Sequence, residues 1–262
     1  MIRSLLVASA LALASAPASA EEDYASPDRP GIADGSNVVG PGRFQIEAGL
    51  QEELRNGAGV HDRLIFLPTL ARLGLTERLE ARVETNAYNW ERTSDPASGV
   101  TYADGAAPVS VGLKYHLQDG AGAARPSVGF IFRLFPASGT GGFGTAHVTG
   151  DFRLAADWDF APHWSLNPNL GVARYEDDQG RTFAAGLFAM TLSYSPSQRL
   201  SLFVDTAEQI PEARGAGSSA IVDGGLAYML NKDVQLDLGV GTGVAGRAPP
   251  HPFLEAGVSK RF

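Results

Sequence analysis

The chain has 262 residues and no cysteine, so no disulfide bond stabilises its fold. Its 29 acidic residues outnumber its 21 lysines and arginines, a balance that argues against a nucleic-acid partner. After the first 20 residues, no stretch contains 18 consecutive apolar residues, which argues against a helical membrane protein.

Residues 1–20 have the pattern of a secretory signal peptide. Arg3 is their only charge, a largely apolar stretch covers residues 5–14, and small residues at 18–20 form a cleavage site. The apolar stretch is too short for a transmembrane helix. Cleavage near Ala20 leaves 20 basic against 29 acidic residues, so the mature chain carries a net charge of −9.

Residues 21–42 form an irregular lead-in, because they combine three prolines and four glycines and show no hydrophobic period. Strand-like alternation starts directly after them and is clearest at residues 148–160. There every second residue, from Val148 to Phe160, is apolar or small, and most of the interleaved positions are polar or charged. Successive side chains of a strand point to opposite faces, so this pattern predicts a long strand with one apolar face.

The same alternation predicts about twelve strands. They cover residues 43–55, 63–75, 78–90, 108–118, 125–136, 147–160, 163–176, 181–195, 199–210, 219–231, 233–243 and 252–262.

The predicted connections alternate in length. Long ones at 91–107, 137–146, 211–218 and 244–251, with a medium one at 56–62, are interleaved with brief turns at 76–77, 161–162, 196–198 and 232. Outer-membrane barrels have this asymmetry, with short periplasmic turns and longer outer loops. A short connection at 177–180 and a longer one at 119–124 depart from it.

The apolar face of these strands is expected to meet lipid. About twelve strands would overfill a closed interior with apolar side chains, since eight strands already fill one. The prediction is therefore an all-β, transmembrane antiparallel up-and-down β-barrel at residues 43–262. Terminal Phe262 resembles the C-terminal aromatic residue of outer-membrane barrels, which implies the outer-membrane assembly machinery as a partner of the last strand.

Three segments carry a resemblance to one family. They are Asp28-Arg29-Pro30, residues 42–49 (GRFQIEAG) and residues 72–83 (RLGLTERLEARV). On these motifs the chain resembles the outer-membrane family called MetA-pathway of phenol degradation, described as transporters, over nearly its whole mature length. The resemblance implies a barrel in the outer membrane of a Gram-negative cell, for the uptake of small aromatic or hydrophobic compounds.

Charged residues mark the face that is expected to line the lumen. On the hairpin that turns at Glu77, with the first strand beside it, they are Arg72, Glu80, Arg82, Glu84 and Glu47. A ring of charges can act as a solute filter, but a self-neutralising ladder is favoured because unpaired buried charge is costly. Further lumen candidates are Lys114, Arg133, Asp151, Arg153, Asp157, Asp205, Asp223, Asp237 and Glu255.

Two fates are open for residues 21–42. The segment can fold back into the barrel, where Asp28 and Arg29 would pair with lumen charges and narrow the pore, or it can remain a disordered terminus. About twenty extended residues span roughly 65 Å against an apolar band about 25 Å tall, so reach does not decide between them.

Nothing in the sequence indicates an enzyme, a cofactor or a metal site. Two Gly-x-Gly-x-x-Gly matches, at 139–144 and 241–246, lie in or beside loops, whereas a dinucleotide fingerprint must open a helix. The five histidines lack metal-ligand spacing. His61, His147 and His251 are expected near the outer rim, where an outer-membrane hydrolase remains a third possibility.

The sequence thus predicts a passive outer-membrane channel for small solutes, in contact with membrane lipid. The alternative is a barrel with a structural role that conducts nothing.

Overall fold

The computed structural model describes residues 23–57, 59–246 and 249–262. The predicted signal peptide therefore lies outside the described residues. Those residues form thirteen strands and no helix, so they include no helix that could cross a membrane. The strands are β1 (Phe44–Gly57), β2 (Val60–Gly74), β3 (Leu79–Asp95), β4 (Gly99–Gly105), β5 (Ser110–Gln118), β6 (Ser127–Phe135), β7 (Thr149–Ala161), β8 (Trp164–Glu176), β9 (Thr182–Tyr194), β10 (Leu200–Ile210), β11 (Ser219–Asn231), β12 (Val234–Ala245) and β13 (Phe253–Arg261).

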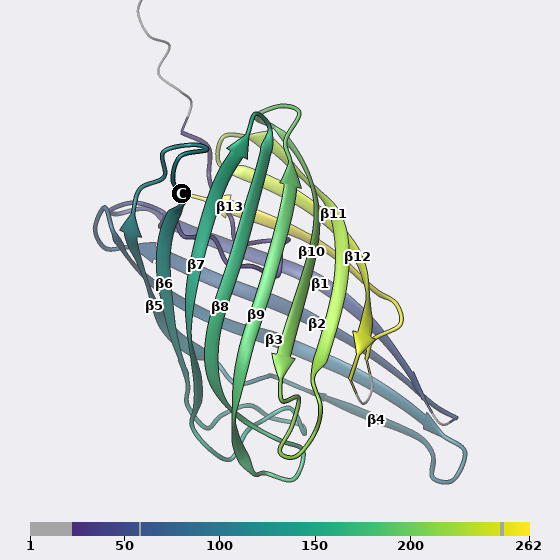
Figure 1. Cartoon of the computed structure of the whole chain (residues 1–262). Coiled ribbons are helices and arrows are strands. Elements are labelled where there is room, and N and C mark those ends of the chain that lie inside the picture. Colours follow the sequence, from purple (N-terminus) through teal and green to yellow (C-terminus); the bar gives the residue numbers. More distant parts are fainter. Residues whose placement is uncertain (1–22, 58, 247–248) are drawn as a thin grey trace, which may run out of the picture.

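Twelve of these strands close into an antiparallel barrel (Figure 1). The first and last strands pair with each other, with Gln45 opposite Arg261, and this pairing completes the ring. β4 is not part of the closed ring. It pairs only with residues 89–95 of β3, whereas β5 pairs with residues 79–84 of the same strand. The predicted barrel of about twelve strands is confirmed.

Two predicted connections are wrong because strand pairing continues through them. Residues 91–107 were expected to be irregular, but β3 runs on to Asp95 and turns back into β4. Gly99, at a φ of +84°, permits this turn, and Val100, Thr101 and Tyr102 are residues that favour strands. Likewise β1 and β2 pair up to Gly57 and Val60, so most of the expected medium loop at 56–62 is strand. These extended strands project past the rest of the barrel (Figure 1).

The barrel has apolar side chains outside and charged side chains inside. Leu154 and Leu170 on the outer surface are 46% and 60% exposed, whereas the inward Lys114 and Glu47 are 0% exposed. This arrangement reverses that of a soluble protein and is typical of a barrel embedded in lipid. At the end that carries the C-terminus, the ring pairs Trp158 with Phe160 and Trp164 with Tyr194 begin an aromatic girdle.

Candidate functional site in the barrel lumen

The segment at residues 23–42 lies inside the barrel and has no regular secondary structure. It starts beside the turn between β11 and β12, where the Ala25 N–H donates to Lys232 O at 2.7 Å. It leaves beside the turn between β2 and β3, where the Gly42 N–H donates to Gly74 O at 2.9 Å. Between these points the segment is surrounded by the wall, and Ser36 at its centre is 0% exposed.

Asp28 joins the segment to the basic part of the wall. Both of its carboxylate oxygens accept hydrogen bonds from Lys114 Nζ at 2.8 Å. Arg82 and Arg72 lie 3.3 and 3.6 Å from Asp28 Oδ2. Three bases from β2, β3 and β5 therefore converge on one carboxylate of the segment.

Arg29 joins the segment to the opposite, acidic part of the wall. Its Nη2 donates to Asp237 at 2.9 Å and to Glu255 at 3.2 Å. Gly49 and Gly257, paired directly across β1 and β13, lie beneath the guanidinium. A Cβ on either glycine would approach Arg29 atoms to 2.7 and 2.3 Å, so this close contact requires glycine.

The rest of the segment is held by groups all around the wall. The Ile32 N–H donates to Asp205, and Asp34 pairs with Arg82 and Arg153 at 3.0 and 3.3 Å. Further anchors are the Ser36 bonds to Ser127 and Asp157, the Asp34 N–H bond to Asn169, and the Val39 N–H bond to Glu80. The segment is thus tied to strands on every side of the lumen.

Most of the predicted lumen charges form ion pairs. Arg72 lies directly opposite Arg82 and pairs with Glu80 at 2.8 Å and Glu47 at 3.0 Å. Arg133 pairs with Asp151 and Glu84 in the same way. All fourteen candidates are buried or half-buried on the inner face; the half-buried ones are Glu84, Arg153, Asp157, Asp223 and Glu255.

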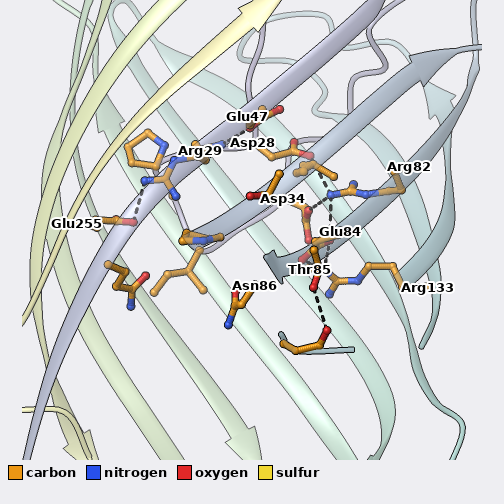
Figure 2. A pocket seen from close by; sticks show the side chains of 18 of the residues that line it. Asp28, Arg29, Asp34, Glu47, Arg82, Glu84, Thr85, Asn86, Arg133 and Glu255 are labelled. Carbon is orange, nitrogen blue, oxygen red and sulfur yellow. Dashed lines mark hydrogen bonds and ion pairs between the residues drawn. The ribbon is translucent and has the colours of Figure 1, made fainter. Parts of the chain in front are cut away.

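A hollow remains on each side of the segment. The one toward the far end of the barrel has a volume of about 420 Å³, and Figure 2 shows Arg29 and Glu255 on one side of it and Arg82, Glu84 and Arg133 on the other. A second hollow of about 550 Å³ lies toward the end at which β13 ends, where Arg261 is one of its lining residues. The two hollows share no lining residue, because residues 23–42 lie between them.

Part of the inner wall is apolar, which the alternation of residues did not predict. Leu70, Ile221 and Phe253 line the 420 Å³ hollow together with Ile32 of the segment. On β2 residues 64–70 are apolar on both faces apart from Thr69, so alternation could not identify the inward side. Such a nearly continuous apolar run was itself the available signal, since it requires an apolar surface inside the barrel as well as outside.

The histidines form ordinary polar contacts. His61 bonds to Asn56, His147 to Glu176 and His251 to Thr242. His116 Nε2 lies 2.8 Å from Asp119 in the following turn, and this hydrogen bond lowers the pKa of the Asp119 carboxyl. Within residues 23–246 and 249–262, apart from position 58, no three His, Asp or Glu side chains converge on a metal position.

Comparisons with solved structures place the fold among outer-membrane barrels. An outer membrane channel from Pseudomonas putida F1 is 15% identical, with a TM-score of 0.64 over 87% of this chain and 98% of that one. The β domain of the Bordetella autotransporter BrkA is 10% identical, with a TM-score of 0.55 over 83% and 98% of the two chains. The CymD monoaromatic hydrocarbon channel is 9% identical, with a TM-score of 0.50 over 85% and 89%.

The comparison with curated proteins finds no match. The family described as "Putative MetA-pathway of phenol degradation" matches residues 27–262 of the 262 residues. This agrees with the resemblance of the Asp28-Arg29-Pro30 and strand motifs, and the chain belongs to that family.

Proposed function

We propose that this barrel is an outer-membrane channel for passive passage of small solutes, and that residues 23–42 act as a plug in its lumen. The observation that carries the proposal is the segment's position between two hollows that share no lining residue. A barrel that serves only as a scaffold has no need for hollows on both sides of an inserted segment. The plug would keep the resting conductance low and regulate it by moving.

Small, partly apolar solutes are the proposed cargo. The 420 Å³ hollow combines charged side chains with the apolar side chains of Leu70, Ile221 and Phe253. A site of this size, with apolar walls and a few oriented polar groups, suits a single-ring compound. Family membership supports aromatic or hydrophobic solutes, and a monoaromatic hydrocarbon channel is among the structures with a similar fold.

Conductance in planar bilayers tests the channel proposal. We expect the variant that lacks residues 21–40 to conduct several times more than the wild-type protein. The control is Gly217→Ala, a substitution in an outer loop of a chain that keeps residues 21–40. If neither the wild-type protein nor the variant without residues 21–40 conducts, a structural role is favoured instead. The buried ion pairs of the lumen would be the basis of that role.

The location of the plug can be tested independently of conduction. The chain has no cysteine, so Ser36→Cys, at a position that is 0% exposed, introduces a single thiol that a membrane-impermeant reagent can report. In lipid-embedded protein we expect slow labelling that becomes fast on unfolding. Gln179→Cys, in an exposed loop, should label rapidly in both states. Rapid labelling of position 36 in the folded barrel would contradict the plug.

A further inference from the structure

The charge of the lumen wall is unevenly distributed. On β2, β3, β5, β6 and β7 buried bases alternate with carboxylates, but the inward faces of β10–β13 carry four carboxylates in the same region: Asp205, Asp223, Asp237 and Glu255. The one base on these inward faces, Arg261, lies at the chain end and pairs with Asp233 and Asp23. Arg29 of the plug neutralises part of this acidic wall by pairing with Asp237 and Glu255.

Asp205 and Asp223 retain acceptor atoms that no protein group uses. They face each other directly across β10 and β11, which brings their side chains to within about 5 Å. Asp205 is 5% exposed, and its Oδ2 accepts bonds from Ile32 N–H and Thr191. Among the described residues, neither Asp205 Oδ1 nor Asp223 Oδ1 has a hydrogen-bond donor, and no lysine or arginine pairs with either residue. Opposed carboxylates of this kind are destabilising unless a positive group or a proton lies between them.

An aromatic ring lies beside this carboxylate pair. Phe253 and Asp223 both pack over Gly241, where a Cβ would come within 2.2 Å of Phe253 Cζ and 2.4 Å of Asp223 Cβ. Asp223, Glu255, Phe253 and Ile221 all line the 420 Å³ hollow. A carboxylate provides a charge-assisted hydrogen bond to an ammonium group, and a neighbouring aromatic ring attracts the same cation.

We propose that Asp223, supported by Asp205 and Glu255, binds the ammonium group of a small organic cation whose apolar part lies against Phe253 and Ile221. This site rests on the proposed channel function and specifies a class of solute that the lumen binds. On the opposite wall the bases are paired with carboxylates, as Arg72 is with Glu80 and Arg133 with Asp151.

Equilibrium binding to the full-length protein in lipid nanodiscs tests the site. Benzylammonium, benzyl alcohol and benzoate share one ring and differ in charge. We expect benzylammonium to bind about tenfold or more tightly than benzyl alcohol, and benzoate to bind more weakly than both. Asp223→Asn should remove the preference for the ammonium, whereas Glu53→Gln, which removes an inward carboxylate that pairs with Arg55 instead, should leave it unchanged. Equal affinities for the three probes, or a preference that survives Asp223→Asn, would overturn the site.

A second measurement applies if Asp223→Asn does not assemble. Ile221→Cys leaves every carboxylate in place and reports occupancy of the hollow by its rate of thiol labelling. Benzylammonium should protect this thiol at concentrations at which benzyl alcohol does not, and equal protection would overturn the proposal. Because both readouts report occupancy of the site and not conduction, a barrel that binds the ammonium but never conducts would refute the channel function and leave the site intact.

Discussion

Arg72 is the residue on which the buried charge network converges. Its guanidinium is 1% exposed and bonds to Glu47, Glu80 and two plug carbonyl oxygens, those of Ser26 and Asn37. Arg72→Met would leave two buried carboxylates without a counter-charge, and such losses cost about 3–5 kcal/mol. We expect this decrease in the free energy of unfolding, measured in lipid vesicles with urea. Arg181→Met, which breaks an exposed loop pair with Asp177, should change it little; equal effects would show that burial does not govern the network.

Gly257 provides a test of how closely the plug fits the wall. Gly257→Ala adds a Cβ at 2.3 Å from Arg29 Nε and 2.7 Å from Asp237 Oδ1, so the guanidinium must leave its position. We expect the plug to loosen, and a single cysteine introduced at Ser36 should then be labelled several times faster. Gly57→Ala is the control, because a Cβ at that strand position meets nothing within 4 Å. Unchanged labelling in the Gly257 variant would mean that Arg29 does not hold the plug.

Each barrel strand presents one face to lipid and one to the lumen, and one arginine placed on each face measures the difference in cost. Leu154 lies in the middle of β7 on the outer face, so Leu154→Arg should destabilise the barrel by roughly 2–4 kcal/mol if that position is near the bilayer midplane. Gln51→Arg introduces the same side chain into the wall of the 420 Å³ hollow and should cost much less. Urea unfolding in vesicles compares the two, and similar penalties would contradict the assigned faces.

The plug as an element can be locked in place. Ser36 Oγ and Ser127 Oγ lie 2.6 Å apart, close to the 2.05 Å or so of a disulfide. In the Ser36→Cys, Ser127→Cys double variant, we expect the oxidised barrel to conduct less than the same barrel after reduction. The single Ser36→Cys variant should show no redox effect. Conductance that does not change on reduction of the double variant would mean that plug movement does not control the pore.

The sequence was sufficient for most of the barrel because alternation is a local property of each strand. It predicted the strand order and the inward charges, since a charged face and an apolar face can be separated along residues such as Asp151, Phe152 and Arg153. It failed where pairing depends on a partner strand, as at residues 99–105, which are strand only because β3 extends beside them. The sequence also did not identify the apolar part of the lumen wall, because both faces of β2 are apolar there. Only closure of the barrel determines which of the two faces points inward.

At the scale of the whole molecule, the lumen carries more negative than positive charge. The predicted inward residues comprise nine carboxylates and five bases, and the described plug adds Asp23, Asp28 and Asp34 against Arg29. An open pore with such walls should attract cations, most strongly at low ionic strength, where wall charges are least screened. The buried pairs cancel much of each other's field, so the preference should be modest and should arise mainly from the four carboxylates on β10–β13.

Reversal potentials across a salt gradient measure this preference in the variant that lacks residues 21–40. We expect cation selectivity at 10–30 mM KCl that largely disappears near 1 M, where the screening length falls to about 3 Å. The double variant Asp223→Asn, Glu255→Gln should lose most of the selectivity, whereas Glu53→Gln should retain it, because Glu53 is neutralised by Arg55 at 2.6 Å. Anion preference at low salt would contradict the charge argument. Selectivity that is the same at low and high salt would instead place its origin in pore width, because steric exclusion does not depend on screening.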